Sequence, residues 1–466
     1  MSNELGLVSA DQMDAQNSKI DTLNGKEEAR NTVLSTMLGK LDIVGERLTE
    51  IRNVLSEDIS KQIVYGFHID ASESDPEKAV VYLKDAAGLS PAHMDFTNDT
   101  FVYGSWEDAF FMPRPCMIRY DGTVDYYLNP NDYTKKMDGT TSDIADDTYA
   151  GNAMMEWGKN GQKIWYKIVP DTTPTSASVY ISNVQVDPDY HAWSFINNLG
   201  RMVDHFYTPI YNGTLDSNGK LRSISGKAYT ALCQGKNATQ EIAAARLNNP
   251  TGGDLWNTEV YADVVLINLL LILMGKSLNT TAVFGNGRCG QASAAENMLG
   301  TGTMNDKGLF WGSNANTSGV KVFGMENWWG NQWRRYAGHV LIEGVHKYKL
   351  TKGRQDGSTA DDYVQSTTGS DYDSYIAGVN DPGANGYVSQ MTFDGNNFMQ
   401  SSVANGDSTK FWADYYWRNT GCRYACHGGD CAYSAGAVGA FFVYLAGTAS
   451  NADWSFGAAP SCKPLS

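Results

Sequence analysis

Residues 322–333 read VFGMENWWGNQW, which places three tryptophans within six positions and Gly330 between the second and the third. Indole rings this close, interrupted by a glycine, indicate a tightly packed turn. Glu326 and Asn327 carry the acceptors and donors that irregular backbone needs where no sheet satisfies it. A role for Glu326 as catalytic acid or base is the alternative, but no nucleophile or histidine lies near it in the sequence. The stretch therefore predicts a structural core segment.

The composition around this stretch is typical of a turn-rich β scaffold with aromatic packing and an aromatic contact surface. The 466 residues include 47 Gly, 26 Tyr and 12 Trp, and only 19% are charged. The net charge is −16, and no cluster of Lys and Arg supplies the positive surface that nucleic acid or an anionic membrane requires. We therefore expect neither a nucleic-acid partner nor membrane insertion.

The longest apolar run, residues 264–274, is interrupted by Asn268 and is far shorter than the roughly 20 residues that span a bilayer. It indicates a buried core helix over 257–276, with Asn257 or Thr258 as N-cap. A second helix is predicted over 238–246. Short β-rich runs separated by turn clusters surround these helices, at 80–83, 117–120 and 163–169. The mixture predicts an α+β fold, with a long polar excursion over 352–395.

The N-terminal part predicts a helix over 14–56. Its apolar residues recur at alternating spacings of 3 and 4, as in the a/d seam of a heptad repeat: Leu34, Met37, Leu41, Val44, Leu48, Ile51 and Leu55. So narrow a seam favours an N-terminal coiled-coil helix that assembles as a homotrimer. The alternative is an amphipathic helix packed on its own domain, although such a helix usually shows a wider apolar face.

Four of the seven cysteines lie near the C-terminus: Cys422, Cys426, Cys431 and Cys462. The first three, with His427, offer a zinc site, but their spacing fits no standard zinc motif. A disulfide between two of them is a further alternative. Residues 1–5 have neither the basic nor the apolar stretch of a secretory signal, so we expect mostly reduced thiols.

Two segments resemble a known family. Residues 322–333 are similar to the Glu-Asn-x-x-Gly-Asn-x-Trp core segment of the C-type lectin fold shared by formylglycine-generating enzymes and phage tropism proteins. Residues 412–459 resemble, in layout, the variable segment of retroelement-diversified proteins of the major-tropism-determinant type: Arg, Gly-Gly, a Gly/Ala-Phe strand, Ala-Ser-Asn, then aromatic-x-x-Gly. The resemblance implies three parts: a coiled-coil stalk for virion attachment over 1–60, a small β-rich domain over 61–150, and a C-type lectin-fold domain over 151–466 with a variable-type segment at 412–456.

One compositional feature bears on diversification. The 52 residues from Phe411 to Cys462 contain no Lys, Glu, Gln or Met, although these types make up 66 of the 466 residues. At average usage about seven would be expected there. In the family, diversification replaces adenines in Asn-type codons, which cannot yield those four residues but yield Tyr, Asp, His, Ser, Cys, Arg, Gly and Ala. A buried Gly/Ala-rich sheet that excludes long polar side chains is the alternative, but it does not account for the many Asp, His, Arg and Tyr.

The resemblance also implies which side chains contact a ligand on a solvent-facing surface. These are Asp414, Tyr415, Tyr416, Arg418, Asn419, Tyr424, His427, Asp430, Tyr433, Ser434, Tyr444, Asp453 and Ser455. The scaffold residues beneath them would be Trp412, Gly428, Gly429, Gly439, Phe441 and Gly457.

The implied function is that of a phage tail receptor-binding protein, an adhesin rather than an enzyme, without a cofactor. Its partners would be a host-surface protein or glycan and, through the stalk, other virion proteins. It would be assembled in the bacterial cytoplasm and carried in the virion tail. The alternatives are a fixed structural tail protein and an oxidase of the formylglycine-generating type, whose cysteine positions this chain does not match. His191, His205, His339 and His346 are isolated from one another in the sequence, which favours packed or surface histidines over metal ligands. The acidic loop 138–147 could bind Ca²⁺, but it has no known Ca²⁺-ligand spacing, so the sequence does not decide whether a metal ion is bound.

Overall fold

The computed structural model describes residues 10–60, 62–349, 365–366, 375–395 and 399–465. The chain forms two units, Met1–Gln62 and Ile63–Ser466. None of the helices in the described part of the chain is both long enough and apolar enough to cross a membrane. The strand-rich mixture of large sheets and few helices confirms the predicted α+β class.

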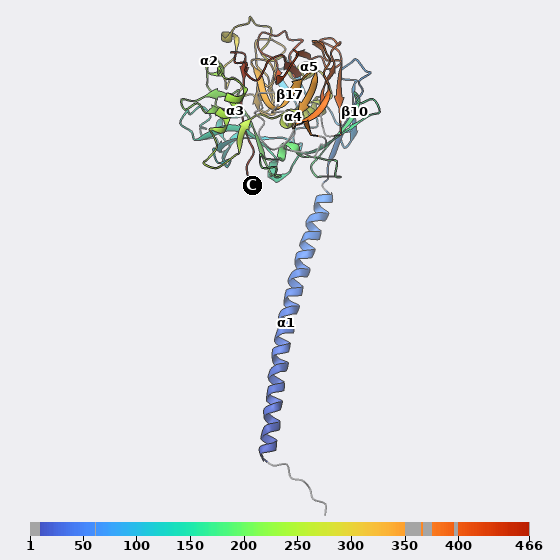
Figure 1. The fold of residues 1–466 in the computed structure, drawn as a ribbon, viewed down its shortest axis with the longest axis vertical. Helices are drawn as coiled ribbons and strands as arrows, with labels where there is room; N and C mark the ends of the chain where they lie inside the picture. Colours follow the sequence, from blue (N-terminus) through green and yellow to red (C-terminus); the bar gives the residue numbers. More distant parts are fainter. Residues whose placement is uncertain (1–9, 61, 350–364, 367–374, 396–398, 466) are drawn as a thin grey trace, which may run out of the picture. The chain divides into compact units, whose positions relative to one another are not determined.

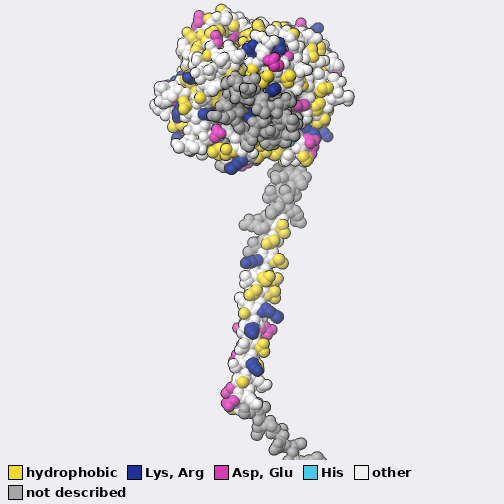
Figure 2. Space-filling model, viewed as in Figure 1, with side chains coloured by type: hydrophobic (Ala, Val, Ile, Leu, Met, Phe, Trp, Pro, Cys, Tyr) yellow, Lys and Arg dark blue, Asp and Glu magenta, His cyan; other side chains and the backbone are white. Residues whose placement is uncertain are grey.

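The described residues of the first unit form one uninterrupted helix, α1 (Ala10–Ser60), shown in Figure 1. It contains the predicted helix and extends it by four residues at each end. The side chains of Leu34, Met37, Leu41, Val44 and Leu48 are 54–69% exposed on it. Figure 2 shows hydrophobic side chains gathered along this helix. The predicted seam residues Ile51 and Leu55 have side chains outside the described part.

Three sheets organise the second unit. One is antiparallel, in the order β2-β1-β10-β9 (Val80–Lys84, Val64–Ile69, Ala177–Ser182, Trp165–Pro170). Another has the order β14-β28-β11-β8-β5-β6-β7 (Trp256–Thr258, Pro460–Cys462, Phe206–Pro209, Gly151–Trp157, Arg114–Arg119, Val124–Asn129, Asp132–Lys136). The β-rich runs predicted at 80–83, 117–120 and 163–169 are confirmed as β2, β5 and β9.

The largest sheet has the order β19-β20-β18-β17-β25-β26-β24-β21 (Gln365–Ser366, Tyr375–Asn380, Val345–Tyr348, Trp333–Ile342, Arg423–Gly428, Gly439–Leu445, Tyr415–Arg418, Gly386–Tyr387), and β27 (Phe456–Gly457) pairs with β17. Short two-stranded pieces complete the unit: β3/β4 (His93–Asp95, Thr100–Val102), β12/β13 (Thr214–Leu215, Leu221–Arg222), β15/β16 (Lys321–Val322, Met325–Glu326) and β22/β23 (Gln390–Phe393, Met399–Val403). Most of the predicted excursion over 352–395 lies outside the described residues.

The domain boundary expected at residue 150 is absent, which corrects the division into 61–150 and 151–466. Strand β5 pairs with β8 across that position, from Arg114 opposite Glu156 to Arg119 opposite Gly151. The C-terminal strand β28 joins the same sheet between β11 and β14. Residues from both predicted domains therefore share one core, because backbone hydrogen bonds of the sheet cross the expected boundary.

Helix α4 (Tyr261–Gly275) is the predicted core helix, and every one of its residues is buried. Its N-cap is Val260, whereas Asn257 and Thr258 lie in β14, so the predicted N-cap and start were wrong. Asn268, the polar residue within the apolar run, donates to Ala440 O (2.8 Å) in β26 and accepts from the Trp328 indole (2.9 Å). Its amide therefore connects the core helix to both segments that the sequence singled out.

The remaining helices are short. Helix α3 (Ala238–Arg246) confirms its prediction, and a capping box between Asn237 and Gln240 begins it. The single-turn helices α2 (Tyr229–Leu232) and α5 (Thr280–Phe284) had no periodic signal in the sequence.

Candidate ligand-binding surface

The segment 322–333 forms the packed turn that its composition predicts. Asn327, Gly330 and Asn331 have positive φ values of 55°, 71° and 64°, and Trp328, Trp329 and Trp333 are buried. The Glu326 carboxylate accepts hydrogen bonds from the backbone amides of Gly302 (2.8 Å) and Met304 (2.9 Å). These contacts confirm the structural role of Glu326, which holds irregular backbone inside the fold.

Gln332 and Asn331 extend this support to the chain around the C-terminal segment. The Gln332 amide donates to Leu232 O (2.8 Å) and Trp454 O (3.1 Å), and Asn331 Oδ1 accepts from Leu299 N (2.6 Å). Strand β17 then runs antiparallel to β25, β25 runs antiparallel to β26, and β26 runs parallel to β24. The segment 412–456 is therefore built onto the strand that the tryptophan-rich turn begins.

Aromatic side chains gather on one face of these strands. Trp417 in β24 lies opposite Tyr444 in β26, and it is 36% exposed. Ring centroids are 5.9 Å apart for Tyr415 and Trp417, 5.8 Å for Trp417 and Tyr433, and 5.1 Å for Tyr387 and Tyr415. The four tyrosines are half-buried. We call Tyr387, Tyr415, Trp417, Tyr433 and Tyr444 the aromatic surface.

Buried rings support the aromatic surface from below. Trp333 lies 5.3 Å from Tyr433 and 5.1 Å from Tyr444, and Phe442 lies 5.3 Å from Tyr433 (centroid distances). Both supporting residues are at most 2% exposed. Rings fixed by edge-to-face packing present contact area and lose little side-chain entropy when a ligand binds. Tyrosine and tryptophan are common in binding surfaces for this reason.

Seven of the thirteen predicted contact residues are exposed or half-buried: Tyr415, Arg418, Asn419, Tyr433, Ser434, Tyr444 and Asp453. Two of them already have partners that fix their geometry. The Arg418 guanidinium pairs with the buried Asp381 carboxylate at 2.5 Å, and Asp453 accepts from Ser455 N at 3.0 Å. The Arg418 side chain is therefore held in one position at the sheet edge beside β21.

The other six predicted contact residues are buried, which corrects the expectation that they face solvent: Asp414, Tyr416, Tyr424, His427, Asp430 and Ser455. The alternation of a β-strand explains Tyr416, which lies between two members of the aromatic surface and points to the opposite face. Tyr424 packs with Val340, and the Ser455 carbonyl accepts from Trp333 N (2.9 Å). These residues form part of the frame.

Asp414 and Asp430 are buried carboxylates that organise backbone. Asp414 Oδ2 accepts from Phe441 N at 2.6 Å, and its carbonyl accepts from Val388 N at 2.8 Å. Burial raises the pKa of Asp414 well above its ordinary value. Asp430 Oδ1 accepts from Ala432 N (2.9 Å), and burial raises the pKa of Asp430 to about 6. Both residues tie turns to strands.

Three histidines on strands of the largest sheet are buried: His339 in β17, His346 in β18 and His427 in β25. His339 Nε2 and His346 Nδ1 are 2.9 Å apart, Tyr336 Oη lies 2.8 Å from His339 Nδ1, and His346 Nε2 lies 3.2 Å from Ser401 O. The distances fit a chain of neutral rings in which Tyr336 donates to His339, His339 to His346, and His346 to Ser401. Burial lowers the pKa of His346 to about 3, and burial also lowers the pKa of His339 well below its ordinary value.

His427, in β25, lies beside this chain. Its ring is 4.7 Å from the Trp328 ring and 5.4 Å from the Tyr336 ring, and burial lowers its pKa well below the ordinary value. Sequence reasoning treated His339 and His346 as unrelated. The register of the β17–β18 hairpin, with Leu341 opposite His346, brings the two rings together. The composition of the sequence does not reveal that register.

The expected scaffold residues occupy positions where a larger or displaced residue would collide. Gly428 has φ 87°, and a Cβ there would lie 2.7 Å from Trp328 O. A Cβ on Gly439 would enter the Asp414 carboxylate, and one on Gly457 would lie 2.5 Å from Gln332 Oε1. Trp412 and Phe441 are buried, and their rings pack 4.9 Å apart. Gly429 has φ 86° and lies against Val438.

Trp417 and Tyr387 are members of the aromatic surface that sequence reasoning missed. Trp417 had an available signal, because it lies two positions from Tyr415 and the period of a strand places both on one face. Tyr387 lies outside 412–456, and only the pairing of β21 with β24 brings it to Tyr415.

The cysteines do not converge. Cys426, Cys422, Cys431 and Cys462 belong to four different hydrophobic clusters, and within the described residues no group of three or more metal-ligating side chains is found. Burial raises the pKa of Cys426 to about 12 and that of Cys431 to about 11. A reactive or metal-binding cysteine needs a stabilised thiolate, which is the opposite condition.

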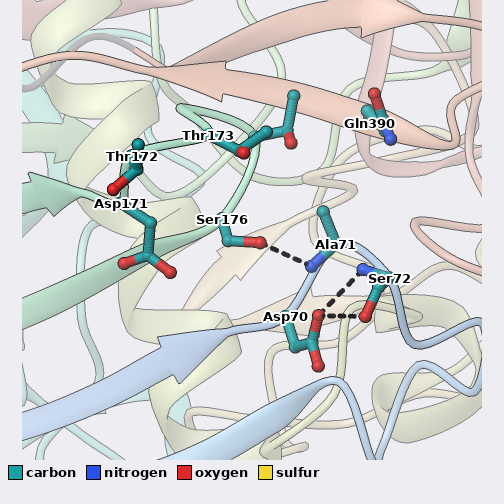
Figure 3. A pocket seen from close by; sticks show the side chains of 9 residues that line it. Asp70, Ala71, Ser72, Asp171, Thr172, Thr173, Ser176 and Gln390 are labelled. Atoms are coloured by element: carbon teal, nitrogen blue, oxygen red, sulfur yellow. Dashed lines mark hydrogen bonds between the residues drawn. The ribbon is translucent and has the colours of Figure 1, made fainter.

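A pocket away from the aromatic surface lies between the turn after β1 and the β9–β10 turn. Its volume is 630 Å³, and its walls include Asp70, Ser72, Asp171, Ser176 and Gln390. Figure 3 shows Asp70 Oδ1 accepting from Ser72 N (2.9 Å) and Oγ (2.6 Å), and Ser176 Oγ accepting from Ala71 N (3.0 Å). These polar groups serve the turns that carry them, so the aromatic surface is the stronger candidate site.

Set against models of protein families and against curated proteins, the chain matches none of them.

Proposed function

We propose that this protein is a receptor-binding protein of a tailed phage, whose second unit takes a C-type lectin fold and presents the aromatic surface to a host-surface protein or glycan. The observation that carries the proposal is the division of one segment, 412–456, into exposed aromatic and polar side chains and a tightly packed frame. Surface substitutions on such a frame usually change stability by within about 0.5 kcal/mol, so binding specificity can vary while the fold persists.

Retroelement diversification of 412–456 is the second part of the proposal. The absence of Lys, Glu, Gln and Met from Phe411 to Cys462 supports it. Burial alone does not account for that absence, because Asn419, Thr420, Ser434 and Asp453 in the same stretch are exposed. At exposed positions Lys and Glu are among the residues ordinarily expected.

The helix α1 supplies the proposed attachment to the virion and the proposed homotrimer. An apolar seam with more than half of each described side chain exposed calls for a partner that covers it. Three copies of the aromatic surface on one assembly would raise weak single-site binding by avidity.

The test is to sequence the encoding locus past the stop codon. A near-copy of the 412–456 coding segment, differing mainly at adenines and lying beside a reverse transcriptase gene, is the expected result. A locus without such a copy would contradict diversification and would favour an adhesin of fixed specificity or a structural tail protein.

Binding itself needs a separate test. Labelled full-length protein is incubated with a panel of bacterial strains, and a double variant, Tyr415→Ala with Tyr444→Ala, is compared with Val81→Ala. Val81 is 51% exposed on β2 in a different sheet and serves as the matched control. We expect the double variant to lose about tenfold or more of the adsorption to any strain that wild type binds, because aromatic anchors dominate such surfaces. Equal adsorption of the two variants would contradict the assignment of the aromatic surface.

A further inference from the structure

The apolar seam of α1 continues towards the N-terminus beyond the heptads already described. Counting back from Leu34 in steps of 4 and 3 reaches Leu23, Ile20 and Met13 at seam positions, and these side chains are 52–64% exposed. The phase therefore stays constant from Met13 to Leu48, with no insertion that would shift the seam. Figure 2 shows the hydrophobic side chains of this helix interrupted by charged ones.

The interruption falls on three seam positions. Gln16 occupies a d position, Glu27 an a position and Arg30 the following d position. Two opposite charges thus replace the apolar residue in successive layers, with apolar layers at Leu23 and Leu34 on either side. All three polar side chains are exposed on α1.

We propose that α1 associates in parallel and in register with the same helix of other copies of this chain, and that Glu27 and Arg30 form a charged double layer that fixes the register. The inference rests on the proposed homotrimer and adds its orientation and the residues that set it. A polar residue at a core position of a coiled coil specifies register at a cost in stability. In a parallel assembly, Glu27 of each copy lies one layer from Arg30 of its neighbour, so each buried charge finds an opposite one.

Slipped registers lose this pairing. A shift by one heptad places Glu27 and Arg30 in the layers of Leu34 and Met37, or of Ile20 and Leu23. A charge without an opposite partner would then be buried against apolar side chains, which is strongly unfavourable. The charged double layer therefore penalises the slipped pairings that a uniformly apolar seam would permit.

The antiparallel arrangement that pairs Glu27 with Arg30 fits the seam less well. It sets residues whose numbers add to 57 opposite each other, so that the apolar Leu41 would face the polar Gln16. Seam residues from Leu48 onward would lie opposite positions that precede the start of α1. The parallel arrangement instead sets each apolar seam residue opposite its own copies, so no apolar layer faces a polar residue.

Orientation is tested by disulfide trapping in the full-length chain. Parallel pairing places position 16 next to its own copies, so a Q16C variant should form a disulfide between copies under mild oxidation, located by peptide mass spectrometry. In an equimolar mixture of Q16C and L41C chains, a disulfide joining positions 16 and 41 would instead reveal the antiparallel arrangement and overturn the proposal.

The charged double layer is tested by charge exchange, with sedimentation as the measurement. E27R and R30E each create two like-charged layers and should raise the dissociation constant of the assembly by about tenfold or more. The double variant E27R/R30E restores opposite charges and should return it to within about threefold of wild type. Single variants that assemble like wild type would overturn the charged layer while leaving the homotrimer intact, whereas a monomeric wild type at micromolar concentration would contradict the homotrimer itself.

Discussion

Neighbouring residues in β24 and directly before it have opposite roles. Tyr415 and Trp417 belong to the aromatic surface, whereas Asp414 and Tyr416 are fully buried and hold the strand to its neighbours. The same division recurs in β26, where Tyr444 is half-buried and Val443 faces the core. The comparison teaches that one short segment supplies both the candidate binding surface and the frame that keeps it in place, with the two-residue period of the strands separating them.

The largest expected effect of a substitution lies in the frame, at Trp328. Trp328→Ala removes a fully buried indole and its hydrogen bond to Asn268 in α4. We expect the free energy of unfolding to fall by about 4 kcal/mol, because large-to-small changes at buried tryptophans leave a cavity. Chemical denaturation followed by fluorescence gives the value, and a loss below about 1 kcal/mol would show that the turn 322–333 is not part of the frame.

The next largest expected effect is the pH dependence of stability that comes from Asp430. Its pKa is about 6 in the folded protein and near 3.9 in an unfolded chain, so the folded state holds the proton more tightly. This group therefore stabilises least above pH 6, and its contribution is lost as pH rises from about 4 to about 6, amounting to about 3 kcal/mol. Asp430→Asn keeps the acceptor for Ala432 N and should remove that pH dependence. If the free energy of unfolding of the variant and of wild type changed in the same way with pH, a buried Asp430 carboxyl with a raised pKa would be contradicted.

At pH 5.5, His346 gives a smaller effect of opposite sign. Its pKa is about 3 in the folded protein and near 6.5 unfolded, so the unfolded chain takes up the proton first. Its contribution to stability is complete well above pH 6.5 and is lost as pH falls, by about 1.4 kcal/mol at pH 5.5. His346→Asn should flatten the acid limb of the stability curve by that amount, relative to wild type measured at the same salt. An unchanged limb would mean that the ring is not buried as a neutral group.

Trp417→Ala should have the smallest effect on stability, because Trp417 is one-third exposed on the aromatic surface. We expect a loss of about 1 kcal/mol or less in unfolding experiments, against about 4 kcal/mol for Trp328→Ala. The two tryptophan variants form a matched pair, since they remove the same side chain from the surface and from the frame. Equal losses would erase the distinction between them.

Local patterns were enough to predict several elements. The apolar run around Asn268 identified α4 as a core helix, the heptads identified α1, and the spacing of tryptophans and glycine in 322–333 identified a packed turn. In each case the signal lies within a few residues of the structure it predicts. Helix periodicity and turn chemistry are local properties, so the sequence carries them directly.

The wrong predictions concern features that depend on contacts between residues far apart in the sequence. The pairing of β5 with β8 removed the boundary expected at 150, and the start of β14 took Asn257 and Thr258 away from the helix. Assigning thirteen contact residues by resemblance ignored the phase of each strand, and a shift by one residue exchanges the two faces. His339 and His346 meet only because the β17–β18 hairpin sets their register.

The most direct test of the division between surface and frame is a substitution library over residues 412–456, scored for folding by resistance to proteolysis. The account predicts broad tolerance at the exposed or half-buried Tyr415, Asn419, Tyr433, Ser434, Tyr444 and Asp453. It predicts intolerance at the buried Asp414, Tyr416, Tyr424, His427 and Gly439. Equal tolerance of the two groups, or greater tolerance of the buried group, would contradict it.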